Sequence, residues 1–255
     1  MSTNPVDRLP DVMQADAEAK ASRLREACRV AGVALPDDPE FHRQLTAVLA
    51  FSDFVAERCT RHPRLLTDLT DSGDLQRTSG AGDYAARLSR ALAGVAEAAD
   101  LGLRLRRFRR REMVRIAWRD LAGLADLAET TADLSALAEA CLDPALAWLY
   151  RWQSAAQGIP TGADGRPQAL VVLGLGKLGA GELNFSSDVD LIFAYPGPGE
   201  TRGTDRPVAN DDFFTRLARK LIQVIGHPTA DRRRSWCWGW ASSGPASSTS
   251  PRTST

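Results

Sequence analysis

The chain has 255 residues and no formal net charge, because 32 Lys and Arg residues balance 32 Asp and Glu residues. Its 44% hydrophobic and 25% charged contents are typical of a globular protein with one large or two small domains. There is no basic excess to indicate nucleic acid as a partner and no apolar run of about 20 residues to span a membrane. The first residues have neither the basic region nor the apolar core of a signal peptide, so we expect none. We therefore expect a cytoplasmic protein.

Cysteine and histidine are too scattered to predict a zinc site or a disulfide framework. The four cysteines are Cys28, Cys59, Cys141 and Cys237, and no C-x-x-C motif occurs. This usage is typical of buried or unreactive thiols in a reducing compartment.

The first half of the chain has the composition and, in part, the apolar periodicity of helices. A helix is expected over 14–31, ending near Gly32, and a longer helix over 39–60, where apolar residues recur at three- and four-residue intervals. A polar, glycine-rich loop is expected over 71–82, and a further helix over 84–97.

A dense run of arginines lies on a predicted amphipathic helix at 101–119. In such a run the charged ends of the arginines usually lie in solvent while the aliphatic parts of their side chains pack on the core. We favour this interpretation for most of these residues. The functional alternative is a surface that faces an anion or an acidic partner. Glu112 falls on the apolar stripe and could pair with an arginine or point into a site. The arginines are Arg104, Arg106, Arg107, Arg109, Arg110, Arg111, Arg115 and Arg119.

The second half is predicted to begin with two further helices and then to change to strands. Two Ala- and Leu-rich helices are expected over 121–140 and 143–157, with Pro144 in the first turn of the second. A Gly/Pro linker at 158–167 marks the expected domain boundary. Short buried strands (169–173 and 189–195), a loop (196–210) and a helix that begins at Asp211 or Asp212 and ends at Gly226 follow.

The stretch between the two predicted strands carries the chemistry. It turns through Gly174, Gly176 and Gly179 and reaches Asp188 and Asp190 where the second strand begins. Side chains two apart on a strand share a face, so the carboxylates are presented together. Their oxygens suit Mg²⁺, which completes its shell with water and substrate phosphates, and the loop N–H groups could face a phosphate. The pattern indicates phosphoryl or nucleotidyl transfer.

Three alternatives compete with this interpretation. Residues 174–179 spell G-x-G-x-x-G, the dinucleotide fingerprint of an oxidoreductase, but only nine residues separate Gly179 from Val189, too few for the usual crossover helix. A P-loop would need a Gly-Lys-Ser/Thr that does not follow. In the third alternative, Asp188 and Asp190 are only polar residues at the start of a strand and bind no ligand. The nearby Ser186 and Ser187 and the glycine loop make this interpretation less favoured.

The same residues resemble a known family. Gly176-Lys177, ten residues and then Asp188-x-Asp190 resemble the signature of the polymerase-β-type nucleotidyltransferase superfamily. The longer run Gly-Lys-Leu-Gly-x-x-Glu-Leu-Asn-Phe-Ser-Ser-Asp-x-Asp-Leu-Ile-Phe-Ala-Tyr resembles the bifunctional glutamine synthetase adenylyltransferase/adenylyl-removing enzymes, in the form of their N-terminal, adenylyl-removing half. The resemblance extends from about Phe41 to Asp231 and includes 49–56 and 108–120.

The resemblance implies an α+β protein in which a mainly helical region precedes a truncated nucleotidyltransferase core with a small mixed sheet. It implies control of glutamine synthetase by adenylylation and phosphorolytic removal of AMP, with ATP or ADP and phosphate as substrates or products. The partners would be glutamine synthetase and a nitrogen-signalling regulatory protein. Asp188 and Asp190 would be catalytic and hold Mg²⁺, and the nucleotide and phosphate would contact Gly174, Gly176, Lys177, Gly179, Ser186 and Ser187. The lysine and the serines could equally be turn and capping residues.

The chain departs from the family pattern after Asp231. No Val, Ile, Leu, Met or Phe occurs from there onward, so the family's next strand and its third carboxylate are missing, and the Ser/Thr/Pro bias predicts disorder. Our hypothesis is a shift of reading frame. We expect a helical region (1–157), a partial core (158–230) and a tail (231–255). The alternative function is an inactive fragment that only binds glutamine synthetase or a signalling partner.

Overall fold

The computed structural model describes residues 9–226, so the expected disordered tail, Cys237 and the reading-frame hypothesis lie outside the described residues. Within the described range, the chain divides into two compact units, one of residues up to 148 with 181–184 and one of 149–180 with the residues from 185 to 226. We describe each unit by itself. The division falls within a helix, and the boundaries expected from the sequence remain predictions.

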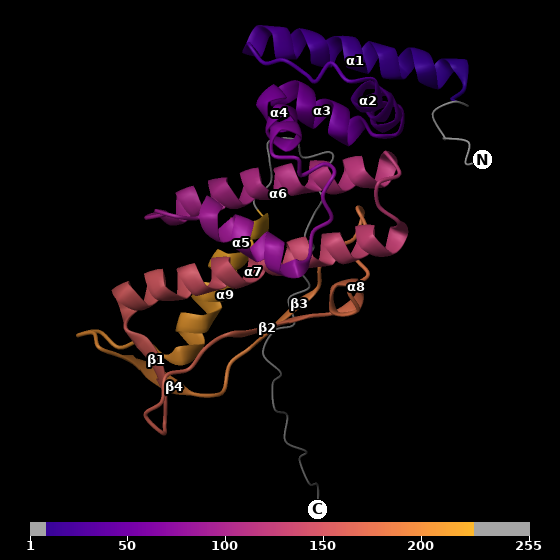
Figure 1. Cartoon of the computed structure of the whole chain (residues 1–255). Helices are drawn as coiled ribbons and strands as arrows, with labels where there is room; N and C mark the ends of the chain where they lie inside the picture. Colours follow the sequence, from indigo (N-terminus) through magenta and orange to yellow (C-terminus); the bar gives the residue numbers. More distant parts are fainter. Residues whose placement is uncertain (1–8, 227–255) are drawn as a thin grey trace, which may run out of the picture. The chain divides into compact units, whose positions relative to one another are not determined.

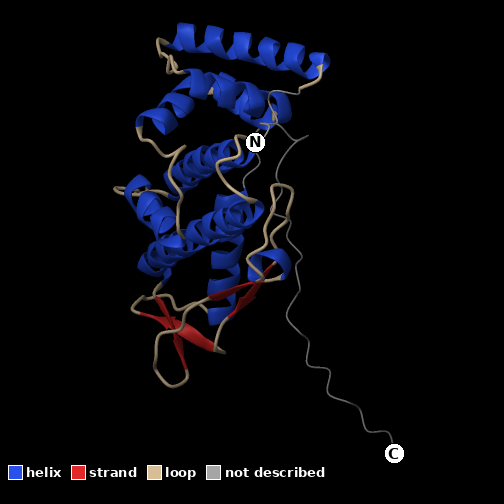
Figure 2. Ribbon diagram, turned by 45° about the vertical axis from the view of Figure 1, so that its right-hand side comes forward, coloured by secondary structure: helices blue, strands red, loops and turns tan. Residues whose placement is uncertain are grey.

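The first unit is helical within the described range (Figures 1 and 2). The predicted helix over 39–60 is wrong in one respect, because the chain leaves the helix at Ser52, which has an extended backbone with φ of −137°. The Ser52 side chain accepts a hydrogen bond from the N–H of Val55 at 3.1 Å and so begins a new helix. The elements are α1 (Asp11–Ala31), α2 (Pro39–Phe51), α3 (Asp53–Arg61), α4 (Pro63–Asp71), α5 (Ala81–Ala91), α6 (Ala98–Leu121) and the first part of α7 (Leu127–Gln157).

The helix α7 corrects a second prediction, because it is one continuous helix with Pro144 inside it. Proline removes a backbone donor and usually breaks or kinks a helix. Here the apolar face continues past the proline, since Leu137, Cys141 and Ala145 are all buried at helical spacing. Burial of that face explains why the helix does not end at the proline.

The core of the first unit is centred on Trp118 of α6, which is fully buried. Its ring stacks on Phe41 of α2 with a centroid distance of 5.4 Å, and its indole N–H donates to Gln44 Oε1 at 3.1 Å. The polar end of the tryptophan is therefore satisfied inside the core.

Among residues up to 226, the second unit contains two antiparallel pairs of strands, the end of α7, a single-turn helix and one long helix. The expected α+β class is confirmed, but the described strand pairs are antiparallel and form no mixed sheet. The segments expected to be a linker and a loop contain the strands β1 and β4. These strands pair closely because Gly162 faces Gly199, and a side chain on Gly199 would meet the Thr161 carbonyl. The elements are β1 (Ile159–Gly162), β2 (Val171–Gly174), α8 (Gly176–Gly179), β3 (Leu191–Ala194), β4 (Gly199–Arg202) and α9 (Asn210–Gly226).

The hairpin strands β2 and β3 are less buried than the sequence predicted. Leu173 is 50% and Ile192 38% exposed, and these two residues are paired across the strands. Val172 and Phe193, the next pair, are half-buried. Only one face of this two-stranded ribbon packs against the rest of the protein, so the side chains of every second residue pair point toward solvent. The buried residues of α9 include Phe213 and Phe214, and Phe213 packs edge-on against Tyr150.

Candidate active site

The register of the β2–β3 hairpin brings the glycine turn and the two aspartates together. Gly174 pairs with Leu191, and one step further the N–H of Leu175 donates to the carbonyl of Asp190 at 2.9 Å. The single turn of α8 begins at the next residue, Gly176. Figure 1 shows β2 and β3 side by side, with α8 beyond the end of the hairpin.

The glycines of this turn have two different roles. A side chain on Gly179 would come within 2.7 Å of the Gly174 carbonyl, and one on Gly174 within 2.8 Å of the Leu178 side chain. These two positions are glycine because the turn is tightly packed. Gly176 instead has a positive φ of 56°, with open space where a side chain would be. Its backbone and the exposed Lys177 are accessible to a ligand.

Asp188 and Asp190 are exposed and lie just before β3 rather than inside it. Val189 between them is 5% exposed and so points toward the interior. This alternation places both carboxylates on the outer side of the extended segment. Ser186 is exposed and Ser187 is half-buried in the turn that precedes them.

The carboxylate pair fits Mg²⁺ as a partial ligand set. Two exposed carboxylates at the end of a hairpin supply hard oxygen ligands, and Mg²⁺ commonly takes one or two carboxylates and completes its shell with water and phosphate. Within residues 9–226, no group of three or more His, Cys, Asp or Glu residues is arranged to hold a metal ion. The described residues therefore offer two protein ligands, both from this segment.

Two further contacts of the second unit were not foreseen from the sequence. Tyr195, the residue after β3, donates its hydroxyl to Asp211 Oδ1 at 3.0 Å and stacks on Phe214. Asn210 is fully buried, and its Nδ2 donates to the Thr161 carbonyl and to Gln168 Oε1, both at 3.1 Å. These bonds tie β1 and the end of β3 to the start of α9. No periodicity signals them, because each joins residues distant in sequence.

The arginine run on α6 is partly a buried ion-pair network. Glu112 is fully buried and accepts from Arg115 at 3.0 Å, Arg111 at 2.9 Å and Arg87 at 3.1 Å. Arg115 is also buried and pairs with Asp133 at 2.8 Å. Glu112 therefore pairs with neighbouring arginines and does not point into a site.

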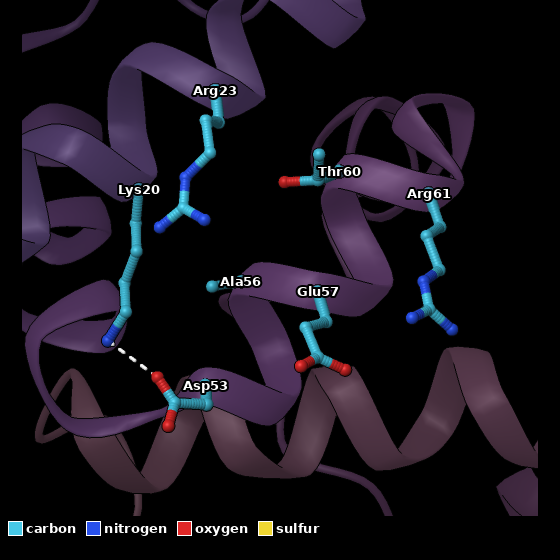
Figure 3. Close-up of a pocket in the computed structure, with 7 residues that line it drawn as sticks. All are labelled: Lys20, Arg23, Asp53, Ala56, Glu57, Thr60 and Arg61. Carbon is cyan, nitrogen blue, oxygen red and sulfur yellow. Dashed lines mark ion pairs between the residues drawn. The ribbon is translucent and has the colours of Figure 1, made fainter. Parts of the chain in front are cut away.

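The described pockets lie in the first unit and do not include the glycine turn. One, of about 190 Å³, is lined by residues of α1 and α3 (Figure 3). Its Lys20 pairs with Asp53 at 2.7 Å and Asp16 at 2.6 Å. Burial opposes the charge of Lys20, but these two carboxylates raise its pKa above the usual value. The lining is Lys20, Arg23, Asp53, Ala56, Glu57, Thr60 and Arg61.

The described cysteines are buried, as expected. Burial raises the pKa of Cys59 and Cys141 to about 12, so these thiols are protonated at neutral pH. In the part of the chain that the structure describes, no helix is both long and apolar enough to cross a membrane.

Comparison with known proteins identifies relatives that share the motif region. The family model described as glutamate-ammonia ligase adenylyltransferase matches residues 42–233. The chain is 47% identical to a protein of Nitrosococcus oceani over 89% of this chain and 23% of the relative, and 45% identical to one of Pseudomonas aeruginosa over 91% and 24%. A protein of Thioalkalivibrio sulfidiphilus is 46% identical over 89% and 23%.

All three relatives are named bifunctional glutamine synthetase adenylyltransferase/adenylyl-removing enzyme. The chain spans about a quarter of the length of these relatives. The match covers most of this chain, including both the helices α2–α7 and the hairpin with its glycine turn. The chain belongs to the glutamate-ammonia ligase adenylyltransferase family.

Proposed function

We propose that this chain supplies a nucleotidyltransferase part of an enzyme that regulates glutamine synthetase by adenylylation and deadenylylation. The part is of the kind that removes AMP from the modified synthetase by phosphorolysis, with ADP as the product. The names of the relatives and the length of the family match support an enzymatic role over an inactive binding fragment.

The observation that carries this proposal is the hydrogen bond from Leu175 N–H to the Asp190 carbonyl. It continues the hairpin ladder past Gly174 and Leu191, so the acidic segment lies beside the start of the glycine turn. Two exposed carboxylates therefore adjoin an open glycine backbone and an exposed lysine. This combination is suited to a phosphate group and its metal ion.

Each residue of the hairpin end has a distinct role in the proposal. Asp188 and Asp190 would hold Mg²⁺, which neutralises charge on the reacting phosphates when bound. The backbone at Gly176 and the side chain of Lys177 approach the phosphate, and Ser186 and Ser187 offer hydroxyl groups. Gly174 and Gly179 keep the turn closed. Catalysis of an in-line transfer then rests on positioning and charge stabilisation.

The same proposal implies the substrates, the partner proteins and the compartment of the reaction. Nucleotide (ATP or ADP) and phosphate are the small-molecule substrates or products, and glutamine synthetase is the protein substrate. A nitrogen-signalling regulatory protein would control the direction of the reaction. The reaction takes place in the cytoplasm, where the synthetase acts.

The test is release of ADP from adenylylated glutamine synthetase by the full chain in the presence of Mg²⁺ and inorganic phosphate. Asp188→Asn keeps the shape of the side chain and removes its charge, and we expect it to lower the rate by about 10²-fold or more. Asp205→Asn is the matched control, because Asp205 is an exposed aspartate of the same unit outside the hairpin.

Two outcomes would contradict the proposal. Equal rates for Asp188→Asn and the unmodified chain would remove Asp188 from the mechanism. A chain that binds the synthetase but releases no ADP would support the inactive-fragment alternative.

A further inference from the structure

A second group of arginines in the first unit has a different environment from the buried network. Arg58 and Arg61 lie in the last turn of α3, and Arg106, Arg107 and Arg110 lie on α6, which packs against α3. We call these five residues the arginine patch. Each is exposed or half-buried, and none forms an ion pair with an acidic residue within residues 9–226.

The members of the arginine patch are close enough to affect one another. Arg110 Nη1 lies 2.7 Å from His62 Nε2, which joins α6 to the residue after α3. Burial, and then the charges of Arg58, Arg107 and Arg106, lower the pKa of Arg110. Burial, and then the charge of Arg110, also lower the pKa of His62, so its ring is neutral at pH 7 and accepts the hydrogen bond from Arg110.

The fold offsets only part of this positive charge. The carbonyl end of α3 favours Arg58 and Arg61, but Arg106, Arg107 and Arg110 are near the middle of α6, where the helix dipole gives no such help. Glu57 is the nearby exposed carboxylate of α3 and makes no ion pair in the described range. Figure 3 shows Glu57 and Arg61 on one side of the α1–α3 pocket, and Lys20 with its partner Asp53 on the other.

We propose that the arginine patch is a docking site for an acidic segment of a partner protein. The patch occupies about one turn on each of two neighbouring helices, a compact area that suits a short run of carboxylates. Guanidinium groups bind carboxylates with two parallel hydrogen bonds, which gives geometric specificity as well as charge complementarity. The proposal does not depend on the reaction at the hairpin.

An exposed leucine beside the arginine patch favours a protein over a nucleic acid. Leu103 is 40% exposed and precedes Arg106, Arg107 and Arg110 at helical spacing, so it lies on the same face of α6. On the other border, Arg111 is already engaged by Asp68 and Asp74. A peptide can place an apolar side chain on Leu103 beside its carboxylates, whereas a phosphate backbone presents a charge at each nucleotide and no apolar side chain.

The experiment measures binding of a fluorescently labelled peptide of alternating glutamate and leucine to the full chain by fluorescence anisotropy. The comparison peptide has glutamine in place of glutamate, and a single-stranded oligonucleotide of equal charge is the competing probe. The test variant is R106Q/R107Q. The matched control is R25Q/R29Q, which removes the same charge from exposed arginines of α1.

We expect the glutamate peptide to bind, the glutamine peptide not to bind, and R106Q/R107Q to weaken binding by about tenfold or more while R25Q/R29Q leaves it unchanged. Sodium chloride at about 0.3 M should release the peptide, because exposed charges are screened. R58Q/R61Q should reproduce the loss from the α3 side, with circular dichroism to show that each variant is folded. Weakening by the control R25Q/R29Q equal to that by R106Q/R107Q, or tighter binding of the oligonucleotide that is lost in R106Q/R107Q, would overturn the proposal.

Discussion

The helix α6 and the end of the β2–β3 hairpin both concentrate charge, but they bury it to opposite degrees. On α6, Glu112 and Arg115 are fully buried and bonded to each other. At the hairpin, Asp188 and Asp190 are exposed and flank one buried valine. A buried charge is tolerated only when it is paired and hydrogen-bonded, whereas an exposed one keeps its water.

This difference separates charges that specify the fold from charges that are free to bind a ligand. The partners of Arg115 come from α6 itself, α5 and α7, namely Glu112, Tyr84 and Asp133, so the network fixes how these helices pack. The hairpin carboxylates are exposed at the segment that precedes β3. Replacing charges in the two regions should therefore have effects of very different size on stability.

The largest effect is expected for Arg115→Met. The variant leaves the buried Asp133 without its ion-pair partner and removes one of the three arginines that pair with Glu112. Removing one member of a buried ion pair costs about 3–5 kcal/mol, and we expect the free energy of unfolding to fall by that amount. Urea denaturation followed by circular dichroism measures the change. Arg107→Met on the same helix is the control, and since Arg107 is exposed its effect should stay within about 0.5 kcal/mol.

A smaller effect that depends on pH is expected for Asp74→Asn. Burial would raise the pKa of Asp74, but the hydrogen bond and charge of Arg111 hold it below its ordinary value of 3.8. Because the pKa is lower in the folded chain, the charged form contributes stability above pH 3.8, and this contribution is lost as the pH falls through the folded-state pKa. At neutral pH the variant should be destabilised by about 1–3 kcal/mol.

The pH series is what distinguishes this prediction from a simple packing effect. Urea midpoints of the unmodified chain and Asp74→Asn should converge as the pH is lowered below 3.8. A difference that stays constant from neutral to acidic pH would mean that shape, and not the charge of Asp74, stabilises the chain here.

The sequence predicts most helices but not where two of them break or continue. The period of apolar residues finds α6 and α9, and an Ala-, Glu- and Arg-rich composition that ends at a glycine finds α1. It misses the break at Ser52, because the apolar spacing runs through it while the capping bond does not show in the pattern. It also splits α7 at Pro144, because a local breaker was given more weight than the buried face that continues beyond it.

The candidate site is predicted from the sequence in its residue types but not in its environment. Spacing alone places Asp188 and Asp190 beside each other, and the glycines mark the turn. It cannot show that strand register brings Asp190 next to Leu175, nor that the hairpin is largely exposed. Strand pairing and the exposure of the hairpin are both set by tertiary structure, which the local sequence pattern does not contain.

The smallest effect on stability is expected for Asp188→Asn. Asp188 is exposed, and the variant removes one of two like charges that are two residues apart, so any change should stay within about 0.5 kcal/mol and could be slightly stabilising. The urea midpoint at neutral pH should match that of the unmodified chain, even though the release of ADP is expected to fall steeply. A destabilisation as large as that of Asp74→Asn would show that Asp188 supports the hairpin, and the loss of activity would then no longer identify it as a metal ligand. An unchanged midpoint with lost activity would place Asp188 with the charges that the fold leaves available for a ligand, in contrast to Glu112 on α6.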